Sequence, residues 1–223
     1  MPTKNRISRT VALTVLLFLS FPSISQAWHD NTHLAIAKAV GYEKWYNVEG
    51  PEIANTHHSY NPPYTVVTPK MILDQMARYN DPADEAGHLY GAIVATLRDY
   101  KSAKASGKYG EYHLTYCAHY VGDLSMPLHN TLYNSFNQRH HVPTDGIVED
   151  EMLDHLERIK LYPIQIESED DLVKGVARIA NLSMKLGYQL ESENRMLTKE
   201  EAYNQLSHSA SFLKAILKWT SEN

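Results

Sequence analysis

The stretch that decides the fold is Ala118-His119-Tyr120-Val121-Gly122-Asp123-Leu124-Ser125-Met126-Pro127-Leu128-His129. His119 and Asp123 are four residues apart, a spacing that places them on one face of a helix. Pro127 is incompatible with a helix interior, so we expect the helix to end or bend there and to carry His129 back beside the other two. A carboxylate and two imidazoles converging at a helix end are typical of a metal site, and histidine favours zinc. A buried helix with two core histidines and a capping aspartate is the structural alternative.

Residues 1–27 have the pattern of a secretory signal peptide, and residues 28–223 are expected to form the exported domain. A basic start, an apolar run too short to span a bilayer and a small-x-small cleavage signal follow one another there. Removal of its three basic residues leaves 18 Lys and Arg against 26 Asp and Glu, a net charge of −8. We therefore expect a secreted or periplasmic protein with no general electrostatic attraction to nucleic acid or to anionic membranes.

The chain contains one cysteine, Cys117, so no disulfide can form within it. Stability must then come from the hydrophobic core or from metal. The 12 histidines are dispersed rather than gathered in one run. This dispersion favours ligands that the fold draws together into one site.

Helical spacing of apolar residues dominates the remainder of the chain, and no alternating strand pattern, repeat or interdomain linker interrupts it. Residues 125–143 read as a loop. The sequence predicts one all-α domain, a multi-helix bundle with long irregular metal-binding loops. The expected helices cover residues 34–40, 68–79, 81–106, 109–124, 145–160, 168–190 and the segment after Thr198.

Further histidines and acids lie near the chain start and in two loops. His33 falls in the first turn of the first helix, and Trp28 would offer a free amine and a carbonyl oxygen if cleavage made it the first residue. An irregular loop carries the adjacent His57 and His58, which are either ligands or ordinary surface residues. His141 and Asp145 repeat the four-residue spacing, although Pro143 between them argues against a regular helix there.

Taken together, these motifs resemble the zinc-dependent phospholipase C / S1–P1 nuclease family, whose members are all-α secreted phosphodiesterases. His119-x-x-x-Asp123-x-x-x-x-x-His129 has the family spacing, and Trp28-x-x-x-x-His33 has that of the nuclease branch. His58-Ser59-Tyr60-Asn61-Pro62 resembles the family's loop histidine, and His141-x-x-x-Asp145 its last ligand pair. The resemblance spans residues 28–160.

The resemblance implies three Zn²⁺ ions. Trp28, His33 and Asp123 would hold the first, and Asp123 would bridge to a second that is held with His58 and His119. His129, His141 and Asp145 would hold the third. The family's catalytic acid before the loop histidine has no exact counterpart here. Glu52 is the best substitute as ligand and general base, Glu49 is the runner-up, and His57 remains an alternative to His58.

The activity implied by the resemblance is hydrolysis of phospholipid phosphodiesters by metal-activated water, with Asp123 and Glu52 as the catalytic acids. The absence of disulfides and the short chain favour this phospholipase C branch, whereas the Trp28–His33 spacing and Asp145 favour a single-strand nuclease. An exported zinc-binding protein without turnover is a third hypothesis. The expected partners are a phospholipid head group or a nucleic-acid phosphodiester as substrate. Membrane contact would be transient, and we expect no stable nucleic-acid partner.

Overall fold

The computed structural model describes residues 28–48, 56–79, 81 and 83–222. Within these residues the fold is all-α, as the sequence predicts, and the only strand-like pairing is an isolated bridge between Asn61 and Thr131. The α-helices are α1 (Asp30–Ala39), α2 (Pro69–Met76), α3 (Leu89–Ala105), α4 (Glu111–Leu124), α5 (Ser135–Asp145), α6 (Glu169–Glu193) and α7 (Lys199–Glu222). The 3₁₀ helices are η1 (Trp45–Asn47), η2 (Pro127–Asn130), η3 (Met152–Asp154) and η4 (Leu156–Arg158).

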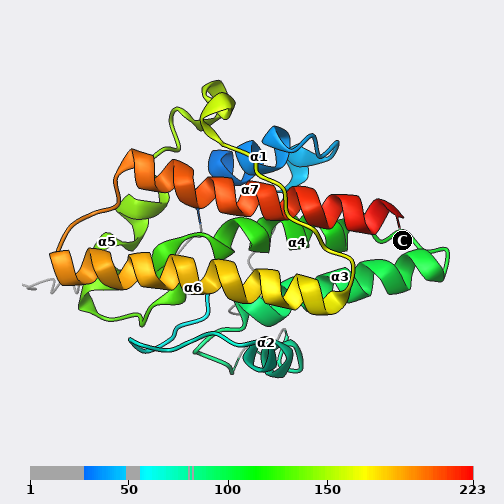
Figure 1. The fold of residues 1–223 in the computed structure, drawn as a ribbon, viewed down its shortest axis with the longest axis horizontal. Coiled ribbons are helices and arrows are strands. Elements are labelled where there is room, and N and C mark those ends of the chain that lie inside the picture. The colour runs from blue at the N-terminus through cyan, green and yellow to red at the C-terminus, as the bar shows by residue number, and fades with distance from the viewer. Residues whose placement is uncertain (1–27, 49–55, 80, 82, 223) are drawn as a thin grey trace, which may run out of the picture.

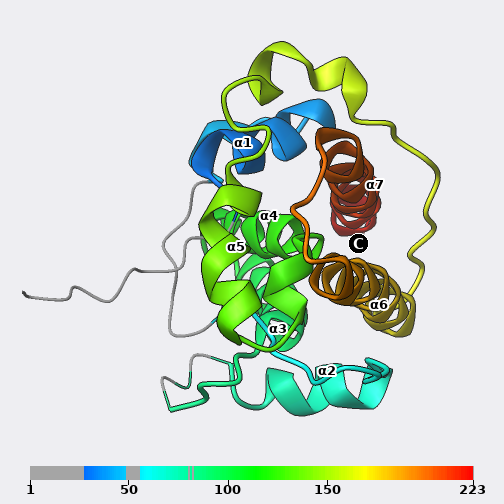
Figure 2. The same cartoon turned by 90° about the vertical axis from the view of Figure 1, so that its left-hand side faces the viewer.

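Helix α4 lies at the centre of the bundle and packs against α1, α3, α6 and α7 (Figure 2). The long helices α6 and α7 run antiparallel to each other across the molecule, and α1 and α2 lie on opposite sides of the bundle (Figure 1). The last ten residues of α4 are almost all buried, among them Cys117, Val121 and Leu124. A ligand on this part of α4 is therefore placed inside the core rather than at the surface. Within the described part of the chain, no helix is long and apolar enough to cross a membrane.

Side-chain caps begin several helices where the sequence predicts them. Thr68 accepts a hydrogen bond from Met71 N and is followed by a proline in the first turn of α2. Ser168 and Asp171 form a reciprocal capping box at the start of α6. Thr198 Oγ1 likewise accepts from the backbone of the third residue of α7. These caps satisfy backbone N–H groups that have no acceptor inside the helix.

Three of the expected segments differ in the structure. The predicted loop at residues 125–143 contains η2 and most of α5, because Asn134 caps α5 and Pro143 lies close to its C-terminal end. The helix expected over residues 145–160 is replaced by the short η3 and η4. The helix expected from residue 81 begins only at Leu89, since residues 83–88 form turns that include Gly87 with φ of +79°.

Close packing of α6 on η2 fixes the segment that carries His129. Gly187 of α6 lies directly against this segment. A Cβ atom added to Gly187 would lie 2.6 Å from Thr131 Cγ2 and 2.8 Å from the carbonyl oxygen of Pro127. Only glycine permits this approach without movement of the η2 backbone.

The variant Gly187→Ala is expected to lower the free energy of unfolding by about 1–2 kcal/mol, because an overpacking cost of about 2–3 kcal/mol exceeds the roughly 1 kcal/mol that alanine gains in a helix. Urea denaturation measures this change. The exposed Lys185→Ala in the same helix is the control and should change stability by no more than about 0.5 kcal/mol. Unchanged or increased stability of Gly187→Ala would contradict the packing described here.

Candidate metal centre

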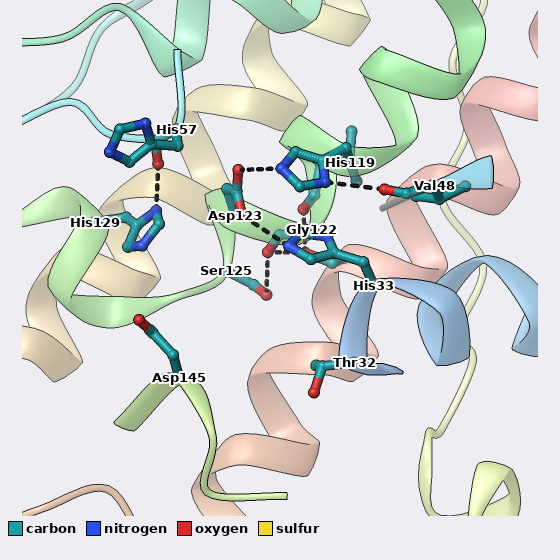
Figure 3. Close-up of polar contacts among 12 residues, drawn as sticks. Thr32, His33, Val48, His57, His119, Gly122, Asp123, Ser125, His129 and Asp145 are labelled. Atoms are coloured by element: carbon teal, nitrogen blue, oxygen red, sulfur yellow. Dashed lines mark hydrogen bonds and ion pairs between the residues drawn. The ribbon is translucent and has the colours of Figure 1, made fainter. Parts of the chain in front are cut away.

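The first candidate metal group joins α1 to α4. His33 extends from α1, and His119 and Asp123 extend from one face of α4, all three fully or almost fully buried. Asp123 Oδ1 lies 3.1 Å from His33 Nε2, and Oδ2 lies 3.4 Å from His119 Nε2. The two imidazole rings stack with their centroids 4.0 Å apart. Figure 3 shows both rings directed towards the Asp123 carboxylate.

Backbone atoms set the orientation of this group. His119 Nδ1 lies 2.9 Å from the carbonyl oxygen of Val48, which can only accept, so Nδ1 carries the proton (Figure 3). His119 Nε2, the nitrogen that faces Asp123, then presents its lone pair. Gly122 lets His33 approach α4 closely, because an added Cβ would lie 2.5 Å from His33 Nδ1.

The second candidate metal group joins η2 to α5. His129 comes from η2, and His141 and Asp145 come from one face of α5. His141 Nε2 lies 3.0 Å from His129 Nε2 and 3.4 Å from Asp145 Oδ2. His129 Nδ1 donates a hydrogen bond to the carbonyl oxygen of His57 (Figure 3). Both ring nitrogens that face the centre of the group are therefore Nε2 atoms.

Asn137 orients the second group from one turn earlier on α5. Its Nδ2 donates to the carbonyl oxygen of Leu128 at 2.7 Å and to Thr131 Oγ1 at 3.1 Å. This arrangement turns Oδ1 towards His141 Nδ1, which donates to it at 2.7 Å. Asn137 thus fixes both the tautomer and the ring position of His141.

Burial shifts the pKa of these ligand groups towards their neutral forms. Desolvation lowers the pKa of His33 to about 3, that of His119 to about 4 and that of His141 to about 3. Desolvation also raises the pKa of Asp123 to about 7, against the opposing effect of His119. Neutral imidazoles keep a lone pair available, and a cation would restore the charged form of the carboxylate.

The structure brings six of the nine predicted metal ligands into these two groups. His129 does not lie beside His119 and Asp123, as the bent-helix argument expected. It joins His141 and Asp145 instead, because η2 turns it away after Pro127. This is the grouping that the family resemblance implies. His141 and Asp145 do share a helix face despite Pro143, so the doubt raised by that proline was wrong.

The other three predicted ligands have different outcomes. Trp28 is 1% exposed, and its backbone lies close enough to His33 to oppose slightly the desolvation that lowers the pKa of that histidine. Glu52 and its alternative Glu49 lie outside the described residues, as does the predicted signal peptide. The structure places His58 outside both groups.

The two histidines of the loop are held differently. His58 Nε2 lies 3.3 Å from the carbonyl oxygen of Glu85, His58 Nδ1 lies 3.0 Å from His57 Nε2, and its ring stacks on Tyr60 at 3.9 Å. The His57 ring lies nearer the second group, with its centroid 5.8 Å from that of His129 (Figure 3). The choice between His57 and His58 as a ligand therefore stays a prediction.

Sequence reasoning did not identify Val48, Gly122 or Asn137 as part of the centre. Asn137 precedes His141 by four residues, so a helix prediction across Pro143 would have found it. The role of Val48 depends on its backbone carbonyl and leaves no signal in the sequence. Comparisons of the chain with protein-family models, with curated proteins and with solved structures find no match.

The variant Gly122→Ala is expected to weaken metal binding at the first group roughly 10-fold or more, because the added methyl group displaces His33. Isothermal titration with Zn²⁺ measures this loss. Gly175→Ala is the matched control, since its methyl group would meet Phe212, 2.4 Å from Cε2, within the α6–α7 packing. The control should lose stability without losing metal affinity. Equal affinity losses in the two variants would contradict the role of Gly122.

Acid is expected to destabilise the metal-free protein from about pH 6.5 downwards. Burial lowers the pKa of eight histidines in the folded state, six of them in or beside the candidate centre and the others His88 and His208, while the unfolded chain takes up their protons near 6.5. Each contributes a slope of at most ~1.4 kcal/mol per pH unit. Asp123 acts in the opposite direction, since its raised pKa loses stabilisation as the pH rises from about 4 to about 7. The six histidines are His33, His57, His58, His119, His129 and His141.

Chemical denaturation in the presence of a chelator, at about pH 7 and about pH 5, measures this dependence. A midpoint that stays constant or rises in acid would contradict it. The double variant His33→Gln/His141→Gln removes two of the eight titrations and should flatten the slope.

Proposed function

We propose that this chain is an exported zinc-dependent phosphodiesterase of the phospholipase C type. The observation that carries the proposal is the pair of buried His/His/Asp groups at the centre of the bundle. One such group could be a core feature. Two groups built on the same His-x-x-x-Asp helical spacing, each completed by a histidine from another element, favour a polynuclear metal centre.

The residues present fit zinc. Each group supplies two imidazole nitrogens and a carboxylate, a donor set that zinc favours and that leaves a fourth position for water or substrate. Among the described residues, neither oxygen of Asp123 accepts a hydrogen bond, and both are buried. A buried carboxylate in this state is stable only if it is protonated or paired with a cation, and a metal ion would supply the positive charge. When bound, the ions would supply Lewis acidity towards phosphate oxygens and lower the pKa of water.

The chain's own residues prepare the centre for this chemistry. Val48 and Asn137 fix the tautomers of His119 and His141, so that Nε2 of each faces its carboxylate. The low pKa values of these histidines keep them unprotonated at neutral pH. Neither imidazole would therefore have to release a proton before it could serve as a ligand.

Aromatic side chains lie beside the second group and support a substrate site there. Tyr60 and Tyr133 stack with centroids 5.5 Å apart, and Tyr133 meets the edge of His141 at 6.1 Å. Tyr133 is 41% exposed, so one member of this stacked tyrosine pair is in contact with solvent next to the candidate metal position. A phosphodiester whose neighbouring group is a quaternary ammonium or a planar base would suit it.

The variant Asp123→Asn is expected to lose zinc and to reduce phosphodiester hydrolysis by at least about 100-fold. The reason is that the Asp123 carboxylate supplies the only negatively charged ligand of its group, between the Nε2 atoms of His33 and His119. Elemental analysis and hydrolysis of bis(p-nitrophenyl) phosphate measure the two effects. Asp99→Asn, an exposed carboxylate elsewhere on the helical surface, is the control. Full zinc content and activity in Asp123→Asn would refute the assignment.

The substrate class is tested by comparing phosphatidylcholine vesicles with single-stranded nucleic acid under the same conditions. The proposal expects release of a phosphorylated head group from the vesicles. Preferential cleavage of nucleic acid would replace it with the nuclease alternative. Stoichiometric zinc without hydrolysis of either substrate or of the generic phosphodiester would favour a zinc-binding protein without turnover.

A further inference from the structure

A single carboxylate links the two candidate metal groups. Glu149 follows Asp145 by four residues, and its side chain reaches the first turn of α1. Its Oε1 accepts a hydrogen bond from Asn31 N at 2.9 Å, and its Oε2 accepts from Thr32 N and from Thr32 Oγ1, both at 3.1 Å. Thr32 directly precedes His33. In Figure 3, Thr32 at the start of α1 and Asp145 both lie below the Asp123 carboxylate, Thr32 on the right and Asp145 on the left.

This distant carboxylate caps the first turn of α1 together with the carbonyl oxygen of His29, to which Thr32 N also donates at 2.9 Å. The first N–H groups of a helix have no acceptor within the helix, and a neighbouring side chain usually supplies one. Here the N-cap residue is His29, whose side chain makes no capping hydrogen bond. Glu149 provides two acceptor oxygens from more than 115 residues away, and its negative charge suits the positive end of the helix dipole. The position of His33 therefore depends on Glu149.

The turn that carries Glu149 is also joined to the end of α5 by backbone hydrogen bonds. Glu149 N donates to the carbonyl oxygen of Gly146 at 3.2 Å, and Ile147 N donates to that of Thr144 at 3.3 Å. A Cβ added to Gly146 would lie 3.4 Å from the ring of His29. The turn thus packs against His29, the N-cap residue of α1, and so connects the start of α1 to the end of α5.

We propose that Glu149 is a positioning residue shared by both metal groups. It holds α1 where His33 meets Asp123, and the same contact holds the end of α5 where Asp145 meets His141. The two groups then fill cooperatively, because occupation of either one restrains the same contact between Glu149 and α1. This inference rests on the metal binding in the proposed function and adds a coupling between its two halves.

The experiment measures Co²⁺ binding by visible absorption at one group at a time. In a His141→Ala background only the first group is intact, and in a His33→Ala background only the second. Glu149→Gln is introduced into each, since glutamine keeps the size and one acceptor oxygen but loses the charge and the second acceptor. We expect Co²⁺ affinity to fall about fivefold or more in both backgrounds. Asp150→Asn, an exposed neighbour, should change it by less than about twofold.

Thr32→Val provides a second variant, because it removes one of the three hydrogen bonds to Glu149 and no charge. It should weaken Co²⁺ binding in the same direction by a smaller factor, and far-UV circular dichroism checks that each variant is folded. Unchanged affinity in both backgrounds, or a loss in only one of them, would overturn the shared role of Glu149. A wild-type chain that binds no Co²⁺ would overturn the proposed function as well, so the two failures are distinguishable.

Discussion

The burial of the Asp123 carboxylate is the constraint on which the rest of this structure depends. It lies on the central helix α4 with no exposed surface, and desolvation raises its pKa to about 7. A carboxylate in this position is tolerated only if it is protonated or paired with positive charge. The two histidines beside it are themselves kept neutral by burial. The fold thus assembles acceptors without the compensating charge, an arrangement that a divalent cation would complete.

The second candidate metal group has the same composition of two histidines and an aspartate, but its residues come from η2 and α5. His119 and Asp123 on α4 correspond in spacing to His141 and Asp145 on α5, and each pair is completed by a histidine from elsewhere. The completing residue comes from α1 in the first group and from η2 in the second. Because these two supports lie on separate elements, the geometry of each group depends on packing contacts between those elements. Gly122 allows His33 to approach α4, and Gly187 allows α6 to approach η2. Glu149 caps the first turn of α1.

The loop of His58 and the side chain of Tyr133 lie beside the candidate centre and differ in their exposure to solvent. The loop of His58 is fixed by backbone pairing, with Ser59 N donating to His129 O at 2.9 Å and Tyr60 N to Ala86 O at 2.8 Å. Tyr133 nevertheless remains partly exposed beside the second group. The six candidate ligands are thus buried, while Tyr133 beside the second group is in contact with solvent.

The sequence by itself determined the helical class, the caps of α2, α6 and α7, and both His-x-x-x-Asp pairs, because these features depend on local spacing and on side chains near the backbone they cap. It misjudged α5, since the Asn134 cap and the hydrogen bonds from Asn137 to Leu128 and Thr131 hold this helix in place despite Pro143. Spacing alone placed His129 beside His119 and Asp123, whereas the family resemblance grouped it with His141 and Asp145, as the structure does. Only the tertiary structure decided that Val48 and Asn137 orient the ligands and that Glu149 caps α1. Those contacts join residues brought together by packing, and neither spacing nor residue type encodes such proximity.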